Sequence, residues 1–132
     1  MKLVKQLSIF LENKPGTLSK VCRALAHEGI NIHAMTVSDT IDHAVIRIVV
    51  SDPDKAVRMF ESSGVLVVET EVIQIDLRNE PGQLAKLSDK LSLGDVNIDY
   101  AYCAADEVQK KGALILRVGD TKKAMKLLKG FH

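Results

Sequence analysis

One short motif occurs twice in this sequence and constrains its fold more than any other feature. The hexapeptide Asn-Lys-Pro-Gly-Thr-Leu at residues 13–18 returns as Asn-Glu-Pro-Gly-Gln-Leu at residues 79–84. The similarity extends beyond the motif, because flanking apolar residues and a later Asn-Ile pair recur at the same offset of 66 positions. A repeat of this length indicates two copies of one small module, so the fold and any site must be sought twice.

The spacing of apolar residues predicts the same order of elements in both copies. Residues 7–11 and 73–77 alternate between apolar and polar side chains, as in a strand with one buried face. After each motif, apolar residues recur at intervals of three and four, which is typical of an amphipathic helix. A second helix is predicted in each copy, where Asp52 or Asp120 can cap its N-terminus. The remaining predicted strands cover residues 31–38, 44–50, 65–68, 97–104 and 113–118.

This order predicts an α+β fold class: two tandem ferredoxin-like βαββαβ units with antiparallel sheets, the second lacking its last strand. We expect the units to comprise residues 1–70 and 71–132. Strand 65–68 is expected to run directly into strand 73–77, because no turn-forming residue separates them. Either a strand is cut off after the last helix, or something else covers the edge that it leaves open. Since an open edge invites pairing with another chain, we expect a partner there.

The overall charge gives no sign of a charged macromolecular partner. With 18 basic and 17 acidic residues, the formal net charge of +1 provides no footprint for nucleic acid or for an anionic membrane. Two cysteines make no disulfide framework and favour a reducing compartment. The first six residues lack the apolar segment of a secretory signal, and no apolar run is long enough to span a bilayer. We therefore expect a cytoplasmic protein without nucleic-acid or membrane partners.

No residue pattern points to catalysis or to a metal. The candidate ligands His27, His33, His43 and Cys103 show no spacing that is typical of a metal site. The sequence contains neither a G-x-S-x-G motif nor a P-loop. We expect no enzyme activity, no catalytic residues, no metal site and no cofactor.

Each residue type of the repeated motif has a physical role at a strand-to-helix junction. An Asn side chain can cap exposed helix N–H groups. Proline fixes φ and lacks an N–H group that would otherwise stay unpaired. Glycine permits close backbone approach, and we expect Leu18 and Leu84 to be the first helix residues to enter the core. The remaining N–H groups, at the positive end of the helix dipole, suit a carboxylate.

The chain resembles the ACT domain family of small-molecule-binding regulatory modules, in particular stand-alone tandem ACT proteins. The resemblance rests on residues 7–18 and 29–32, and on residues 75–84 and 96–98 of the second copy. It implies a homodimeric regulatory module that binds a free amino acid where two ACT units meet. The strand-to-helix loop of one unit would face the start of the second strand of its neighbour. The implied ligand-binding residues are Asn13, Lys14, Pro15, Gly16, Thr17, Leu18, Asn31, Ile32, Asn79, Glu80, Pro81, Gly82, Gln83, Leu84, Asn97 and Ile98.

Other interpretations stay open at this point. Each motif is also a well-made helix start that needs no ligand. Lys14 corresponds to Glu80 and Thr17 to Gln83, so the two loops are chemically unequal and need not both bind. The chain also resembles the amino-terminal parts of acetolactate synthase regulatory subunits. The alternative hypothesis is therefore a subunit that docks on an amino-acid biosynthetic enzyme and has no ligand of its own.

Overall fold

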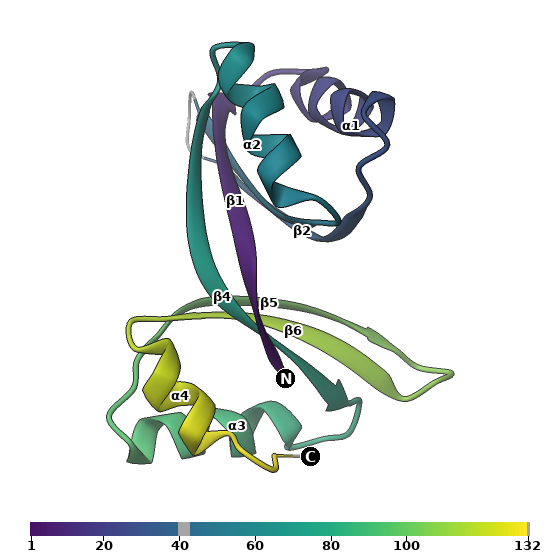
Figure 1. The fold of residues 1–132 in the computed structure, drawn as a ribbon. Coiled ribbons are helices and arrows are strands. Elements are labelled where there is room, and N and C mark those ends of the chain that lie inside the picture. Colours follow the sequence, from purple (N-terminus) through teal and green to yellow (C-terminus); the bar gives the residue numbers. More distant parts are fainter. Residues whose placement is uncertain (40–42, 132) are drawn as a thin grey trace. The chain divides into compact units, whose positions relative to one another are not determined.

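The computed structural model describes residues 1–39 and 43–131 (Figure 1). The chain divides into two compact units: Lys5–Thr70, called here the first unit, and Met1–Val4 with Glu71–His132, the second unit. The divisions fall inside two long strands, β1 (Lys2–Glu12) and β4 (Leu66–Arg78), so each strand contributes to both units. The uninterrupted β4 confirms that one predicted strand runs directly into the next.

The first unit has the predicted ferredoxin-like architecture. Its sheet has the strand order β2-β3-β1-β4, and β3 is antiparallel to both β1 and β2. Both helices lie on one face of this sheet (Figure 1). The elements between β1 and β4 are α1 (Thr17–His27), β2 (Ile32–Asp39), β3 (His43–Val50) and α2 (Pro53–Ser62). The hairpin link expected between β2 and β3 falls on residues 40–42, outside the described residues.

Alternation along the strands gathers the apolar side chains of the first unit on the face that the helices cover. Leu7 pairs with Ile48, and Ile9 with Ile46, across β1 and β3, so these side chains point to the same side. The helices meet this face with residues spaced one turn apart. The buried helix residues are Val21 and Leu25 of α1 and Ala56 and Phe60 of α2. Burial of this apolar surface is the main source of stability of the unit.

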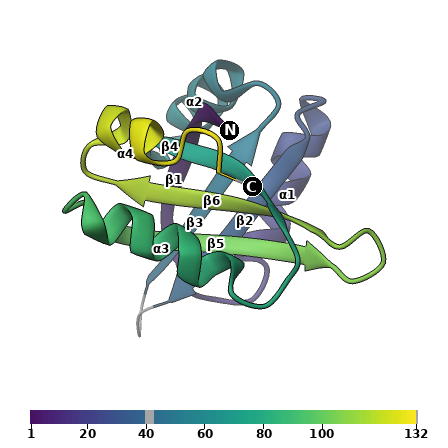
Figure 2. The same cartoon turned by 90° about the horizontal axis from the view of Figure 1, so that it is seen from below.

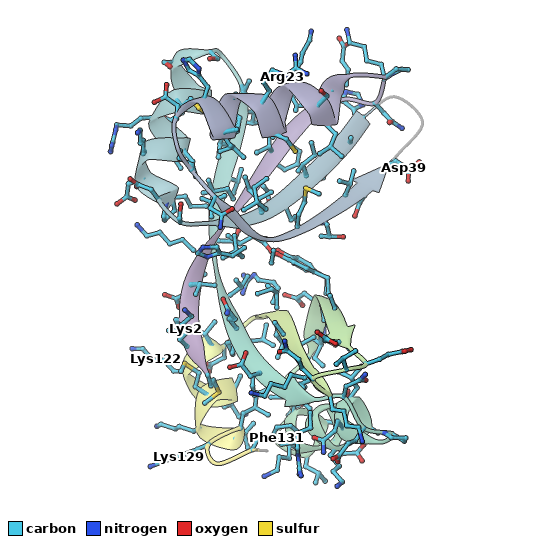
Figure 3. All side chains as sticks on the ribbon, turned by 90° about the vertical axis from the view of Figure 1, so that its right-hand side faces the viewer. Lys2, Arg23, Asp39, Lys122, Lys129 and Phe131 are labelled. Atoms are coloured by element: carbon cyan, nitrogen blue, oxygen red, sulfur yellow. The ribbon has the colours of Figure 1, made fainter. Side chains whose placement is uncertain are left out.

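The second unit repeats this architecture with the strand order β1-β4-β6-β5. Its helices both lie on one side of β5 and β6 (Figures 1 and 2). Phe131 packs against the core, whereas Lys122 and Lys129 point away from it into solvent (Figure 3). The elements after β4 are α3 (Gln83–Leu93), β5 (Ile98–Asp106), β6 (Lys111–Val118) and α4 (Thr121–Leu127). The core residues that are almost fully buried include Ile73, Leu87, Leu91, Leu116, Val118 and Leu128.

Aspartate caps the second helix of each unit, as predicted. At the start of α2, Asp52 Oδ1 accepts a hydrogen bond from the backbone N–H of Lys55 at 3.1 Å. At the start of α4, Asp120 Oδ1 accepts one from the N–H of Lys123 at 3.0 Å. Each bond satisfies one of the N–H groups that a first helical turn leaves unpaired.

The β4 edge of the second unit is covered by the chain itself. No strand follows α4 among the described residues, as predicted. However, β1 is hydrogen-bonded to β4, and Met1–Val4 belong to the second unit. In the sheet of the second unit, the start of β1 thus holds the place that the start of β4 holds in the first unit. The expectation that another chain covers this edge was wrong, because β1 begins at Lys2, before the alternating pattern of residues 7–11.

Removing residues 1–4 should therefore destabilise the second unit. The truncated chain loses the strand hydrogen bonds of these residues and exposes the edge of β4. At about 1 kcal/mol for each net hydrogen bond, we expect a loss of about 2–3 kcal/mol in the free energy of unfolding. Urea unfolding measures this loss, and sedimentation should detect edge-to-edge association. The control variant Lys2→Ala keeps the backbone and should behave as the full chain. A truncated chain that is equally stable and monodisperse would contradict this account.

Candidate functional site

The two copies of the motif form the same strand-to-helix junction. α1 begins directly after Gly16, whose φ is 90° and ψ is −13°. α3 begins directly after Gly82, whose φ is 89° and ψ is −7°. These left-handed conformations are strained for any residue with a Cβ atom, so the repeated glycine is required by the backbone itself.

The predicted capping by asparagine was wrong. The N-cap residues of α1 and α3 are Gly16 and Gly82, and neither helix has a side-chain hydrogen bond at its cap. Asn13 and Asn79 lie three residues before these glycines, so neither asparagine is the N-cap residue. Instead, the backbone N–H of Asn79 donates to the carbonyl of Lys110 at 2.8 Å, which fastens the second loop to the turn between β5 and β6.

The leucine that ends the motif does not enter the core, which corrects a second prediction. Leu18 is 38% exposed and Leu84 is 48% exposed. In α3, the buried positions are Gln83, Leu87 and Leu91, each four residues after the last. A position one residue after Gln83 is rotated about 100° away from that buried stripe. The motif therefore presents an apolar side chain at the surface, beside the loop.

The first turn of each helix leaves two backbone N–H groups available. In the second loop, the N–H of Gln83 donates to the carbonyl of Glu80 at 3.3 Å, and that of Lys86 donates to Gly82 at 3.0 Å. Among the described residues, the N–H groups of Leu84 and Ala85 have no hydrogen-bond acceptor. The first loop is built in the same way: within residues 1–39 and 43–131, the N–H groups of residues 18 and 19 have no acceptor. Such a helix start is suited to an anion.

The charged side chains of the two loops are arranged in opposite order. In the first loop, Lys14 Nζ lies 3.1 Å from Glu12 Oε2. In the second loop, an Arg78 guanidinium nitrogen lies 3.9 Å from Glu80 Oε1. The change from a basic residue at Lys14 to an acidic one at Glu80 is thus accompanied by the opposite change two residues earlier, from Glu12 to Arg78. Because each pair joins one basic and one acidic side chain, neither loop carries a net charge from these residues.

Each loop borders a cavity, and the two cavities differ in size and lining. The first loop lies beside a cavity of about 420 Å³ that extends between α1 and α2 and is lined by Thr17, Val21, Met59 and Phe60. The second loop borders an open pocket of about 220 Å³, which the neighbouring ends of β5 and β6 also line. The two copies therefore offer different spaces next to the same backbone geometry.

The strand starts that the ACT resemblance implies lie far from the loop of their own unit. Arg78, just before the second loop, pairs with Lys111, which also pairs with the end of β5 at Asp106. The start of β5 at Ile98 pairs instead with Val118. Eight residues of extended strand separate the two ends of β5, roughly 26 Å. The first unit has the same register, so neither loop meets the strand start of its own unit: Asn31 and Ile32, or Asn97 and Ile98.

The strand starts also make local hydrogen bonds. The backbone N–H of Asn31 donates to Ser51 Oγ at 2.9 Å, and the N–H of Ser51 donates back to the Asn31 carbonyl at 2.9 Å. The Asn97 side-chain amide donates to Asp99 Oδ1 at 3.1 Å. These contacts hold the chain where it enters β2 and β5.

Burial identifies one residue whose role the sequence analysis missed. Gln83 is among the ligand-binding residues that the ACT resemblance implies, yet its side chain is 3% exposed and lies in the apolar stripe of α3. The signal was present in the sequence, because Gln83, Leu87 and Leu91 follow the four-residue spacing of a buried helix face. A glutamine at such a position requires an explanation.

Other kinds of site find no support in residues 1–39 and 43–131. No cluster of His, Cys, Asp or Glu in this part of the chain is arranged to hold a metal ion. None of the helices there is both long and apolar enough to cross a membrane.

The pKa of Lys5 is raised by its hydrogen bond to Asp54 and by the negative charges of Asp54 and Glu69. Lys5 lies well before the first loop on β1, so this shift does not act on the loop.

Replacing Gly82 by alanine should test the backbone strain at the loop. The left-handed conformation should cost about 1–2 kcal/mol of stability in the variant Gly82→Ala, although no atom crowds the new methyl group. Gly119→Ala is the matched control, because the space around its Cβ is also open and its φ lies outside the left-handed region. Chemical unfolding compares the two variants. Equal effects would show that the conformation of Gly82 is not the cause.

Comparison with known proteins identifies the family. Residues 2–129 match the ACT domain pair family. The crystal structure of protein BT0572 from Bacteroides thetaiotaomicron is 38% identical in sequence, with a TM-score of 0.90 over 96% of this chain and 87% of that chain. The regulatory subunit of aspartate kinase from Thermus thermophilus, in its ligand-free form, shares the fold at 16% identity, with a TM-score of 0.72 over 98% and 96% of the chains. No match was found among curated proteins. The chain belongs to the ACT domain family, as a pair of ACT domains.

Proposed function

We propose that this chain is a non-catalytic regulatory module that binds a free amino acid at its Asn-x-Pro-Gly-x-Leu loops. The observation that carries the proposal is the repeated helix start, where a left-handed glycine precedes two N–H groups that have no acceptor in the described part of the chain. Every free amino acid has a carboxylate, which is the complement of such a pair of donors. Membership of the ACT domain family supports the same interpretation.

The ligand site is completed by a second unit in this proposal. The register within each unit keeps the loop roughly 26 Å from the strand start of that unit. A ligand at the loop of one unit is therefore contacted by the strand start of another unit, which is Asn31 with Ile32 or Asn97 with Ile98. A homodimer supplies such units, and the exposed Leu18 and Leu84 provide apolar contacts at the loop.

Regulation follows from where the ligand binds. A ligand that contacts two units favours the arrangement in which both contacts are made, and it shifts the population toward that arrangement. The size of the shift is limited by the difference in affinity between the two arrangements. The proposed partner is an enzyme of amino-acid metabolism that senses this change in the cytoplasm.

A docking subunit without a ligand is the second candidate function. It is favoured by a separate observation: Leu66 and Val68 of β4 are both exposed apolar residues of a strand. Exposed apolar residues of this kind are common at protein interfaces. Two results would support this role. A pull-down recovers the same biosynthetic enzyme with or without added amino acids, and the isolated chain binds no amino acid.

Binding of amino acids is tested on the purified chain with the twenty proteinogenic amino acids. At a ligand concentration of 100 times Kd, we expect the folded state to gain about 2.7 kcal/mol, which raises the Tm by roughly 8–12 °C. Titration calorimetry checks the affinity of each amino acid that raises the Tm. The matching amino acid amide lacks the carboxylate and should bind far more weakly. The proposal fails if no amino acid produces heat or a shift of the Tm.

A further inference from the structure

The cavity beside the first loop is a cleft between the two helices of the first unit, and its volume is about 420 Å³. Its apolar lining residues are Leu11, Val21, Ala24, Met59, Phe60 and Val65. Val21 and Phe60 belong to the core, but the other four are only half-buried. The cleft therefore leaves apolar surface in contact with water, which is unfavourable.

One position distinguishes this cleft from the equivalent place in the second unit. Ser63 lines the cleft, and its backbone N–H donates to the carbonyl of Phe60. The N–H of Phe131 makes the same bond to the carbonyl of Leu128, so Ser63 and Phe131 hold equivalent positions. Phe131 packs against the apolar core of its unit. The second unit thus places an aromatic ring where the first unit has a small polar side chain.

Two further positions differ in the same direction. Thr17 lines the cleft and is half-buried, whereas its counterpart Gln83 is longer and 3% exposed. The longer side chain covers more of the inward helix face than Thr17 does. At the end of α3, a Cβ on Gly94 would collide with the side chain of Leu127 in α4. The residue at the end of α1 is Glu28, which has a side chain there. α4 therefore packs closely on the end of α3, while α1 and α2 leave a cleft.

A cation without an ion pair stands at the cleft. Lys14 and Lys20 both line it. Lys14 Nζ is paired with Glu12 Oε2 at 3.1 Å, whereas Lys20 has no acidic partner among the described residues. An apolar cleft beside such an ammonium group is complementary to a molecule with an apolar body and one anionic group. At about 30 Å³ for a water-sized group, the cleft has room for on the order of 14 non-hydrogen atoms.

We propose that the cleft between α1 and α2 binds a medium-chain carboxylic acid and that Lys20 binds the carboxylate of this ligand. The apolar chain of the ligand packs against Ala24, Met59 and Val65, which are half-buried without it. This site goes beyond the proposed function, because it uses neither the N–H groups at the start of α1 nor Leu18, which does not line the cleft.

Titration calorimetry with octanoate tests the role of Lys20. We expect one octanoate to bind each wild-type chain, and Lys20→Gln to bind it about fivefold more weakly, as for the loss of an exposed ion pair. The uncharged analogue 1-octanol should bind the wild type more weakly than octanoate does, and Lys20→Gln should leave its binding unchanged. The matched control is Lys86→Gln at the equivalent position of α3, which should bind octanoate as the wild type does.

A second pair of variants tests where octanoate binds. Ser63→Phe copies the second unit, and its ring should weaken octanoate binding about tenfold or more by taking up apolar space in the cleft. Ser62→Phe is the matched control, because Ser62 also donates to the carbonyl of Met59 but does not line the cleft. The Tm of each variant shows that it is folded. If Ser63→Phe does not fold, Ala24→Leu narrows the cleft from α1 and should cause the same loss.

The results for octanoate and for amino acids are independent. The proposed site is ruled out if the wild type does not bind octanoate, if it binds several molecules without saturation, or if Ser63→Phe and Ser62→Phe bind octanoate equally. Equal binding of octanoate and 1-octanol, or equal effects of Lys20→Gln and Lys86→Gln, would also overturn the proposal, because the occupant then needs no anionic group. If octanoate binds as expected and no amino acid binds, the proposed function fails and this site stands.

Discussion

Pairing of β1 with β4 is the interaction on which both units depend. Each unit has about half of the chain, which is near the lower size limit for a stable domain. A sheet of four strands gives such a unit enough apolar surface to bury under two helices. The second unit has only three strands in its own stretch of sequence, from β4 to β6, and it becomes four-stranded because β1 begins early. One pair of long strands thus completes two sheets.

Local patterns explain how much of the fold could be predicted from the sequence. Alternation at residues 7–11 and 73–77 located strands, and Asp52 and Asp120 located helix starts, because these signals act over a few residues. The start of β1 has no such signal. Its residues 2–4 are exposed or partly buried, and their pairing is set by a strand more than sixty positions away. Only the three-dimensional structure reveals that contact.

The candidate site was predicted in outline but not in its chemistry. The motif correctly located two strand-to-helix junctions, whose first helical turns keep N–H groups without acceptors among the residues that the structure describes. Residue type alone gives the wrong burial for Leu18 and Leu84, since an apolar side chain suggests burial but the helix register leaves both exposed. The same register buries Gln83, which a reading by polarity would place at the surface. Which way a helix side chain points depends on where the whole buried stripe of the helix lies. The burial of single residues was therefore predicted less well than the helices and strands themselves.

The division of the chain through β1 has an evolutionary consequence. The second unit is not a continuous segment, because it includes the first four residues. A gene fragment that encodes only the second copy of the motif would lack a strand, and one that encodes only the first copy would carry an extension with nothing to pair with. Either half, moved alone, would therefore lose the β1–β4 pairing that both sheets use, which disfavours recombination of one ACT domain without the other.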